Sequence, residues 1–271
     1  MSTSEQTEIE RKYDVDDEAV VPDLEGVTSV AGGAERVLEA ARVDRAAPVR
    51  LRAVYHDTDD HLLLRSRITL RRRTGGHDEG WHLKLPPVAA GSASSGQDSS
   101  GQEMSSEIPQ GTGTDHSTAA SPSDGSTRGR REVHAPLGSE DEGVPGELLA
   151  RVAEQLGGRT VAPVIVLETT RTATTLRDRE GAPLAELADD VVTATVSGGT
   201  GGTGGTDGTG PSRAEPVVRR WREWEAELAP GVDGPAGDAL LDAIEERLLA
   251  AGAVPSTSRS KLARGLGAEP A

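Results

Sequence analysis

Five residues near the N-terminus, Glu8-Ile9-Glu10-Arg11-Lys12, carry the pattern from which the fold can be argued. Successive side chains of a β-strand point to opposite faces, so Glu8, Glu10 and Lys12 share one face if this stretch is a strand. The alternation runs through residues 7–15 and supports that assignment. The sequence therefore predicts a strand with two carboxylates and one ammonium group on the same face.

Three other segments repeat this arrangement of charges. One face carries Arg71 and Arg73 in the first segment, His82 and Lys84 in the second, and Glu223, Glu225 and Glu227 in the third. The opposite face of the second segment, with Trp81, Leu83 and Leu85, is apolar. Taken singly, each strand is explained by charges that face solvent and apolar side chains that face the core. Taken together, the strands also fit an inverted barrel, in which charged faces line a water-filled lumen and apolar faces pack against outer helices.

Short β-like runs dominate the rest of the chain, separated by turn signals such as Thr74-Gly75-Gly76 and Pro86-Pro87. The predicted strands are residues 7–15, 49–55, 68–73, 80–85, 131–135, 161–176, 183–196 and 217–228. Helices are expected near 33–41, over 145–156 and 235–251, and after Ser258. Many meandering strands with few helices are typical of an antiparallel barrel or sandwich, so we predict a mainly β (α+β) fold.

The composition excludes several kinds of site. The 271 residues include 29 Lys or Arg and 45 Asp or Glu, a net charge of −16 that should repel nucleic acid and anionic membranes. There is no cysteine, which excludes disulfides, thiolate metal sites and a cysteine nucleophile. No apolar run is long enough to span a membrane, and residues 1–7 lack the features of a secretory signal. We therefore expect a cytoplasmic protein.

Two segments of low complexity interrupt the predicted strands. Residues 88–127 are rich in Ser and Gly without any Lys or Arg, and residues 197–216 carry Gly-rich repeats. Neither can bury enough apolar surface to offset the entropy lost on ordering, so we predict that both are disordered inserts. About 210 residues remain, a size suited to one domain.

The two kinds of charge together suit a phosphate–metal complex. Carboxylate oxygens are the ligands that Mg²⁺ and Mn²⁺ prefer. Arginine binds phosphate oxygens through its planar fork and lysine binds them as a point charge. A single charged strand is a common feature, whereas this combination over four segments is much more specific.

The residues quoted above resemble a known family. Glu8-Ile9-Glu10-Arg11-Lys12 resembles the ExExK signature of the CYTH superfamily, the triphosphate tunnel metalloenzymes, and Tyr55-His56-Asp57-Thr58 resembles its YxDT segment. Residues 68–76 and 80–86 are similar to the actinobacterial form, and the match continues in order through 131–133, 185–190, 221–228 and 260–262. The resemblance implies a single domain over residues 1–271, an eight-stranded antiparallel β-barrel that forms a tunnel, with a few flanking helices.

The resemblance also implies the site residues. The phosphate-binding residues would be Lys12, Arg71, Arg73, Lys84, Arg171 and Lys261. The metal, Mg²⁺ or Mn²⁺, would be held by Glu8, Glu10, Glu132, Asp190, Glu225 and Glu227. Glu223 is an alternative to Glu225 or Glu227, and Asp189 is an alternative to Asp190. Glu8, Glu10 and Lys12 are the expected catalytic residues, and Glu10 or Glu225 could activate water.

What the resemblance implies is an enzyme, a divalent-metal-dependent triphosphatase that hydrolyses inorganic or organic triphosphate inside the tunnel. A class IV adenylate cyclase is one alternative, although Ser4-Glu5-Gln6-Thr7 lacks the His-Phe pair that precedes ExExK in some of those cyclases. A non-catalytic module that binds polyphosphate or nucleotide is another. Many actinobacterial relatives continue into a helical CHAD domain, which we do not expect here. The expected partner is a triphosphate-containing small molecule or polyphosphate, not a nucleic-acid duplex or a membrane, and a homodimer is left open.

Overall fold

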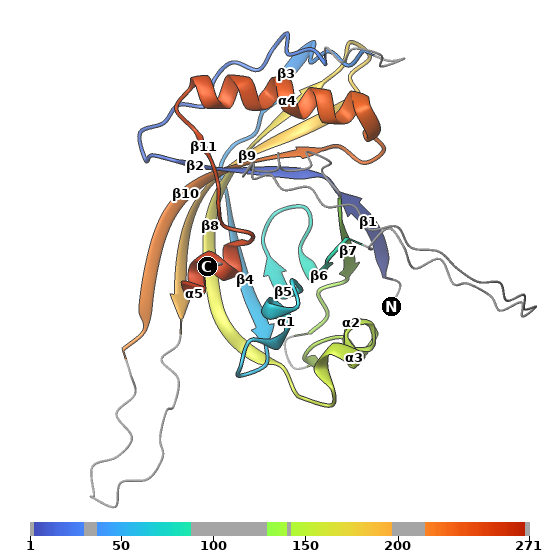
Figure 1. The fold of residues 1–271 in the computed structure, drawn as a ribbon, viewed down its shortest axis with the longest axis vertical. Helices are drawn as coiled ribbons and strands as arrows, with labels where there is room; N and C mark the ends of the chain where they lie inside the picture. The colour runs from blue at the N-terminus through green and yellow to red at the C-terminus, as the bar shows by residue number, and fades with distance from the viewer. Residues whose placement is uncertain (1–2, 30–36, 88–128, 140–141, 197–214, 269–271) are drawn as a thin grey trace, which may run out of the picture. The chain divides into compact units, whose positions relative to one another are not determined.

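The computed structural model describes residues 3–29, 37–87, 129–139, 142–196 and 215–268 (Figure 1). All of them belong to the larger of the two units into which the chain divides, and residues 88–126 make up the other. The predicted insert at 88–127, and all but the last two residues of the one at 197–216, lie outside the described residues. No helix within the described ranges is both long and apolar enough to cross a membrane.

Antiparallel strands make up most of the regular structure. The strands are β1 (Ser4–Glu8), β2 (Glu10–Val15), β3 (Arg42–Arg45), β4 (Val49–Asp57), β5 (Thr69–Thr74), β6 (Gly80–Leu85), β7 (Arg130–Ala135), β8 (Ala162–Arg177), β9 (Pro183–Val196), β10 (Val217–Leu228) and β11 (Val254–Pro255). The helices are α1 (Leu62–Arg65), α2 (Gly146–Arg151), α3 (Ala153–Leu156), α4 (Gly234–Ala250) and α5 (Lys261–Leu266). Each of the eight predicted strands is present, the first as the consecutive strands β1 and β2.

The sheet closes on itself through its first strand. Its hydrogen-bonded order is β1-β7-β6-β5-β4-β8-β9-β10-β2-β11, with β3 beside β8. β1 pairs with β7 and β2 pairs with β10, while only Ile9 separates β1 from β2. The Ile9 carbonyl oxygen accepts a hydrogen bond from the Leu228 N–H at 3.0 Å. Counted as one bent strand, β1 and β2 complete a ring of eight strands, which is the antiparallel barrel predicted from the sequence.

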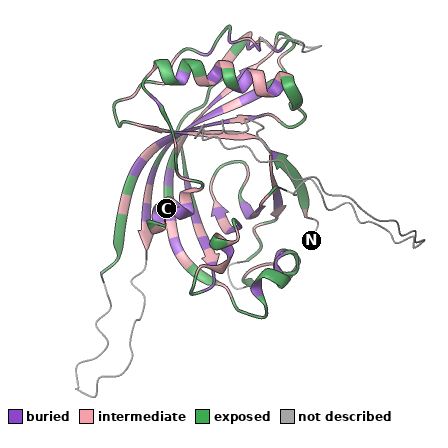
Figure 2. Cartoon of the chain, in the orientation of Figure 1, coloured by how far each residue is buried: buried purple, intermediate pink, exposed green. Residues whose placement is uncertain are grey.

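The apolar faces of the strands pack outward against helices. Trp81 of β6 lies in a buried cluster with Leu148 of α2 and Leu156 of α3. Trp224 of β10 lies in a second cluster with Ile244 of α4. Buried and less buried residues alternate along the strands, and α4 exposes the side that faces away from them (Figure 2). The charged faces are therefore left to the inside of the ring, as the inverted arrangement requires.

Polar contacts fasten α4 to the outer face of β2. The guanidinium group of Arg11 donates to Asp242 and to Glu245, each at 2.6 Å. The hydroxyl of Tyr13 donates to the same Glu245 carboxylate at 3.0 Å. Arg11 and Tyr13 alternate with Glu10 and Lys12, so one strand holds the helix with its outer face and presents charges with its inner face.

Helix α5 packs against the inner face of β8 and β9. Leu262 belongs to a buried cluster with Ile165 and Leu167 of β8 and Ala194 of β9. These residues point to the same face of their strands as the inward charges Arg171 and Asp190. A Cβ atom at Gly265 would lie 2.6 Å from Cδ1 of Ile165, so a larger residue there would require the Ile165 side chain to shift. Because α5 begins at Lys261, this packing brings the Lys261 side chain to the ring interior.

The Tyr55-His56-Asp57-Thr58 segment, at the end of β4, hydrogen-bonds to the start of helix α1. Asp57 is fully buried, and its carboxylate accepts hydrogen bonds from the N–H groups of Leu63 (2.9 Å) and Leu64 (3.0 Å). It thereby satisfies free N–H groups of the short helix α1, which was not predicted. Thr58 contributes a further bond, its hydroxyl accepting from the Leu62 N–H at 2.9 Å.

The helix expected near 33–41 is wrong for its described part, residues 37–41. Leu38 and Ser29 bond in both directions: the Ser29 N–H donates to the Leu38 carbonyl and the Leu38 N–H donates to the Ser29 hydroxyl, each at 2.8 Å. The Ala40 N–H donates to the Val27 carbonyl at 2.8 Å. Since residues 26–29 take up these backbone groups, they are not available for helical hydrogen bonds.

Candidate functional site

The inner face of the ring borders a cavity of about 400 Å³. All of the implied phosphate-binding residues line it, namely Lys12, Arg71, Arg73, Lys84, Arg171 and Lys261. Of the implied metal ligands, Glu8, Glu10, Glu132, Glu225 and Glu227 line it as well. Asp190 is completely buried behind this lining and contacts Arg171 and Lys261. Strands and a helix far apart in the sequence thus bring the predicted residues into one chamber.

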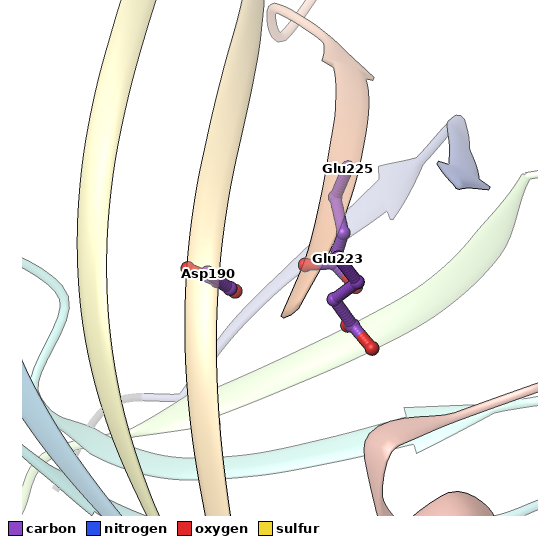
Figure 3. A group of neighbouring side chains, drawn as sticks. All are labelled: Asp190, Glu223 and Glu225. Atoms are coloured by element: carbon purple, nitrogen blue, oxygen red, sulfur yellow. The ribbon is translucent and has the colours of Figure 1, made fainter. Parts of the chain in front are cut away.

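One group of carboxylates in this chamber is already neutralised by cations. Asp190 projects from β9, and Glu223 and Glu225 project from β10, with one oxygen of each lying within 4.8 Å of the others (Figure 3). The Nζ atom of Lys261 lies 3.1 Å from Asp190, 2.5 Å from Glu223 and 2.8 Å from Glu225. Arg171 donates twice to Asp190, at 2.8 and 2.7 Å. We call these three acids with Lys261 and Arg171 the Lys261 cluster.

Nearby cations keep Asp190 and Glu225 of the Lys261 cluster ionised. Burial acts to raise the pKa of Asp190, but Lys261 and Arg171 outweigh it, and the net shift is downward. Burial likewise opposes ionisation of Glu225, yet Lys12, Lys261 and Arg171 hold its pKa well below the usual range. Since Lys261 occupies the space among the three carboxylates, their proximity does not by itself make a free metal site.

Lys12 connects this cluster with a second one. Its Nζ atom lies 3.0 Å from Glu10 and also pairs with Glu225. Burial acts to raise the pKa of Glu10, but Lys12 and Lys84 outweigh it and hold the value at about 2. The burial of Lys12 is offset by Glu10 and Glu225, so the net shift of its pKa is upward. Lys12 is therefore a charged group shared between two sets of acids.

The second group, which we call the Glu8 cluster, consists of Glu8, Glu10, Glu132 and Glu227 with Lys84. Lys84 Nζ lies 2.5 Å from the Glu8 carboxylate. Burial raises the pKa of Glu8 to about 8, and the neighbouring acids Glu132 and Glu227 raise it further, although the positive charge of Lys84 acts to lower it. Burial raises the pKa of Glu227 to about 7. The negative charge of Glu10 adds to this shift, and the positive charge of Lys84 opposes it. This part of the chamber holds more buried carboxylates than its lysine can keep ionised.

A divalent cation fits the Glu8 cluster on chemical grounds. The donors are all carboxylate oxygens, which suit Mg²⁺ or Mn²⁺. Burial is the main cause of the raised pKa values of Glu8 and Glu227, and neighbouring carboxylates add to it, whereas the pKa values of Glu10 and Glu132 are lowered by nearby cations and hydrogen bonds. A bound cation would favour the ionised forms of Glu8 and Glu227. In the Lys261 cluster, the shifts of pKa described above are downward instead.

The two arginines of β5 have different surroundings. Arg71 donates to the Tyr55 hydroxyl at 3.3 Å and lies 3.9 Å from the Glu132 carboxylate. Arg73 has only 5% of its side chain exposed, and burial together with Arg71 and Arg171 lowers its pKa to about 9. The carboxylate that pairs with Arg73 comes from Asp78, in the turn between β5 and β6.

The structure separates the two acids that the sequence left as alternatives on β9. Asp190 faces the chamber, as described above. Asp189 accepts hydrogen bonds from Arg222 Nε at 2.8 Å and from Trp224 Nε1 at 3.1 Å, on the other face of the sheet. Strand pairing supports this division, because Asp190 lies opposite both Arg171 and Glu223.

Two residues of the site were not singled out as such from the sequence. Asp78 lies in a predicted turn, where nothing in the alternation of strand residues indicates its direction. His82 shares a face with Lys84, which the alternation predicts, and its Nδ1 atom lies 3.0 Å from Glu132. Its Nε2 atom donates to the Asp78 carbonyl oxygen at 2.9 Å. His82 thus joins the β5–β6 turn to the Glu8 cluster.

Comparison with known proteins places this geometry in a family. The model of the CYTH domain matches residues 6–196. An uncharacterized protein of Mycobacterium tuberculosis, present in two strains, is 38% identical over 261 residues, which is 96% of this chain and 40% of the relative. The chain thus spans about two fifths of the length of the curated relatives it matches.

Solved structures are similar at low identity. A candidate adenylate cyclase from Bacillus halodurans is 15% identical with a TM-score of 0.49, covering 96% of this chain and 97% of its own. A candidate adenylyl cyclase from Hippeastrum, described as having a dominant triphosphatase activity, is 14% identical with a TM-score of 0.42, covering 84% and 86%. A Pyrococcus horikoshii protein is 14% identical with a TM-score of 0.45, covering 97% and 99%. On the strength of the family match, the chain belongs to the CYTH domain family.

Proposed function

We propose that this chain is a divalent-metal-dependent triphosphatase that hydrolyses a triphosphate inside its barrel. Members of the CYTH domain family are enzymes that act on triphosphate-type substrates with a divalent metal. One observation carries the proposal: six cations from β2, β5, β6, β8 and α5 line a single cavity of about 400 Å³ beside a cluster of carboxylates. Such a chamber can bind a polyanion and a metal ion at the same time.

The Glu8 cluster is the place where Mg²⁺ or Mn²⁺ would bind. Glu8, Glu10, Glu132 and Glu227 would hold the ion, because these four carboxylates line the cavity beside a single lysine, Lys84. When bound, the ion would supply charge neutralisation at the phosphate oxygens and would lower the pKa of a coordinated water.

The protein's own cations would bind and orient the phosphates. Arg71 and Arg73 offer planar donors from one strand, and Lys12, Lys84 and Lys261 offer point charges. Stabilisation of charge that builds up during phosphoryl transfer is the main task of such groups. Glu10 and Glu225, both ionised and both in contact with Lys12, are the candidates to accept a proton from the attacking water. With inorganic triphosphate, the products are phosphate and diphosphate.

The test is to incubate the purified chain with inorganic triphosphate, ATP or thiamine triphosphate, each with Mg²⁺ or Mn²⁺. Release of phosphate and formation of cyclic AMP are measured in the same samples. We expect phosphate release that depends on the metal and stops with a chelator. Cyclic AMP without phosphate release would establish the cyclase instead. Binding of triphosphate or polyphosphate without either product would establish a binding module.

A further inference from the structure

The pairing of Arg73 differs from that of the five other cations that the resemblance implies as phosphate-binding residues. Within the described residues, Lys12, Lys84, Arg171 and Lys261 pair with carboxylates that belong to the strands of the wall, and so does Arg71. The partner of Arg73 is Asp78, which belongs to the β5–β6 turn. The Asp78 side chain is 42% exposed, whereas that of Arg73 is 5% exposed. The carboxylate of Asp78, which is not part of the barrel strands, therefore pairs with Arg73, which lines the chamber.

Arg73 still has capacity to bind an anion. Its Nε atom is buried and makes no hydrogen bond with any residue that the structure describes. Burial of a guanidinium group with a donor left unpaired is unfavourable, so a ligand with several acceptor oxygens would be better matched to it than one carboxylate. A phosphate group offers such a set of oxygens.

The backbone of the turn is held in place independently of the Asp78 carboxylate. The Asp78 carbonyl oxygen accepts a hydrogen bond from His82 Nε2 at 2.9 Å. Gly75, at φ +83°, packs so closely that a Cβ atom would overlap the carbonyl oxygen of Arg50. The Asp78 side chain can therefore rotate into solvent without displacing the turn, because the turn does not depend on the ion pair.

The position of the turn distinguishes the two ends of the chamber. Arg73 and Asp78 lie at one end of the β5–β6 hairpin, and Thr69 and Lys84 lie at the other. A second cavity of about 710 Å³ adjoins that other end and is lined by Thr69 and Pro86, among others. The Asp78 carboxylate thus stands at the end of the hairpin away from this second cavity.

We propose that the Asp78 carboxylate occupies the position on Arg73 that a phosphate group of the substrate takes, and that binding of the substrate displaces it. Asp78 then lowers the affinity of the chamber for triphosphates by competing for Arg73. The inference rests on the proposed function, because it assumes that a triphosphate is bound by this set of cations. It adds a residue that sets affinity without belonging to the barrel wall.

The experiment compares Asp78→Asn with Glu79→Gln. Both variants remove one negative charge from the same turn, and Glu79 is exposed. Binding of inorganic triphosphate is measured by calorimetry in the presence of a chelator, so that binding is recorded apart from metal-dependent turnover. We expect Asp78→Asn to lower the dissociation constant about fivefold, a size typical of a partly exposed ion pair, and Glu79→Gln to change it by less than about twofold. Asp78→Ala should give the same gain as Asp78→Asn.

The outcomes separate this proposal from the proposed function. Equal affinities of wild type and Asp78→Asn would overturn the competition by Asp78 and leave triphosphate binding intact. An equal gain in Asp78→Asn and Glu79→Gln would also overturn it, since the effect would then be a general one of charge. If none of the proteins bound triphosphate in the presence of the chelator, the competition by Asp78 would be overturned, whereas the proposed function would fail only if metal-dependent release of phosphate were also absent. Circular dichroism of each variant checks that the fold is retained.

Discussion

The Lys261 cluster and the Glu8 cluster are two sets of carboxylates in one chamber that have different numbers of cations beside them. In the Lys261 cluster, Lys261 contacts three acids and Arg171 contacts two of them. In the Glu8 cluster, Lys84 faces an excess of acids, and the pKa of Glu8 rises to about 8. Identical side chains thus receive different properties from the number of cations beside them.

This difference changes where a metal ion is expected. Proximity alone would select Asp190, Glu223 and Glu225, whose oxygens are close together. Charge balance favours the Glu8 cluster instead, because a lysine already fills the space among the first three acids. On the proposed function, the Lys261 cluster would belong to the wall, and the Glu8 cluster would be the part that holds a metal ion.

The largest effect is expected from the residue that joins the two clusters. Replacement of Lys12 by Ala removes the cation shared by Glu10 and Glu225, and it also removes a phosphate ligand. We expect kcat/KM for triphosphate hydrolysis to fall by about 10²–10³-fold, the usual loss for one donor that stabilises developing charge. Phosphate release is measured beside circular dichroism. Wild-type turnover by a folded Lys12→Ala protein would contradict the assignment of the chamber as the active site.

The comparison between the clusters can be tested by removing one lysine from each. Lys261→Ala leaves three buried carboxylates without their shared partner, and we expect the free energy of unfolding to drop by about 3–5 kcal/mol. Lys84→Ala should cost less, because Glu8 can bind a proton when its partner is lost. Urea unfolding at pH 7 with a chelator measures both. Equal losses would contradict the difference in charge balance.

The Glu8 cluster should also make stability depend on pH. The pKa of Glu8 rises from its ordinary value of 4.5 to about 8, and that of Glu227 rises to about 7. Between pH 6.5 and 8 the folded protein keeps protons that the unfolded chain has lost, so stability should fall as pH rises. Below pH 6.5, His82 acts in the opposite direction, because burial lowers its pKa to about 4. His56 also has a lowered pKa because of burial, and the contribution of both histidines fades as pH rises above 6.5, so the two glutamates dominate toward pH 8.

Thermal unfolding measures this effect without added metal and with a chelator. The melting temperature should decrease from pH 6.5 to 8 in the wild type and decrease less in Glu8→Gln, whose side chain cannot ionise. Mg²⁺ or Mn²⁺ should raise the melting temperature of the wild type more at pH 8 than at pH 6.5, because binding favours the ionised cluster. A flat profile in the wild type would argue against an excess of carboxylates.

The regular parts of the site could be predicted from the sequence. Alternation along a strand fixes the face of a side chain, which is why Glu10 with Lys12 and Arg71 with Arg73 were placed together correctly. The partner of each cation could not be predicted, since ion pairs depend on which strands become neighbours. Asp78 lies in a turn, where side-chain direction follows no simple period. The helix expected near 33–41 failed for residues 37–41 because pairing with residues 26–29 outweighed local pattern.

The smallest effect tests the division between the two aspartates of β9. Asp189→Asn should change kcat/KM by less than about twofold, because Asp189 contacts Arg222 and Trp224 on the outer face of the sheet. Asp190→Asn should lower kcat/KM about tenfold, since it weakens the contacts that hold Arg171 and Lys261 in the chamber. Both substitutions preserve side-chain size, so steady-state hydrolysis with matched thermal unfolding compares charge at adjacent positions. A larger loss of activity in Asp189→Asn than in Asp190→Asn would reverse the assignment of the two faces, and with it the membership of the Lys261 cluster.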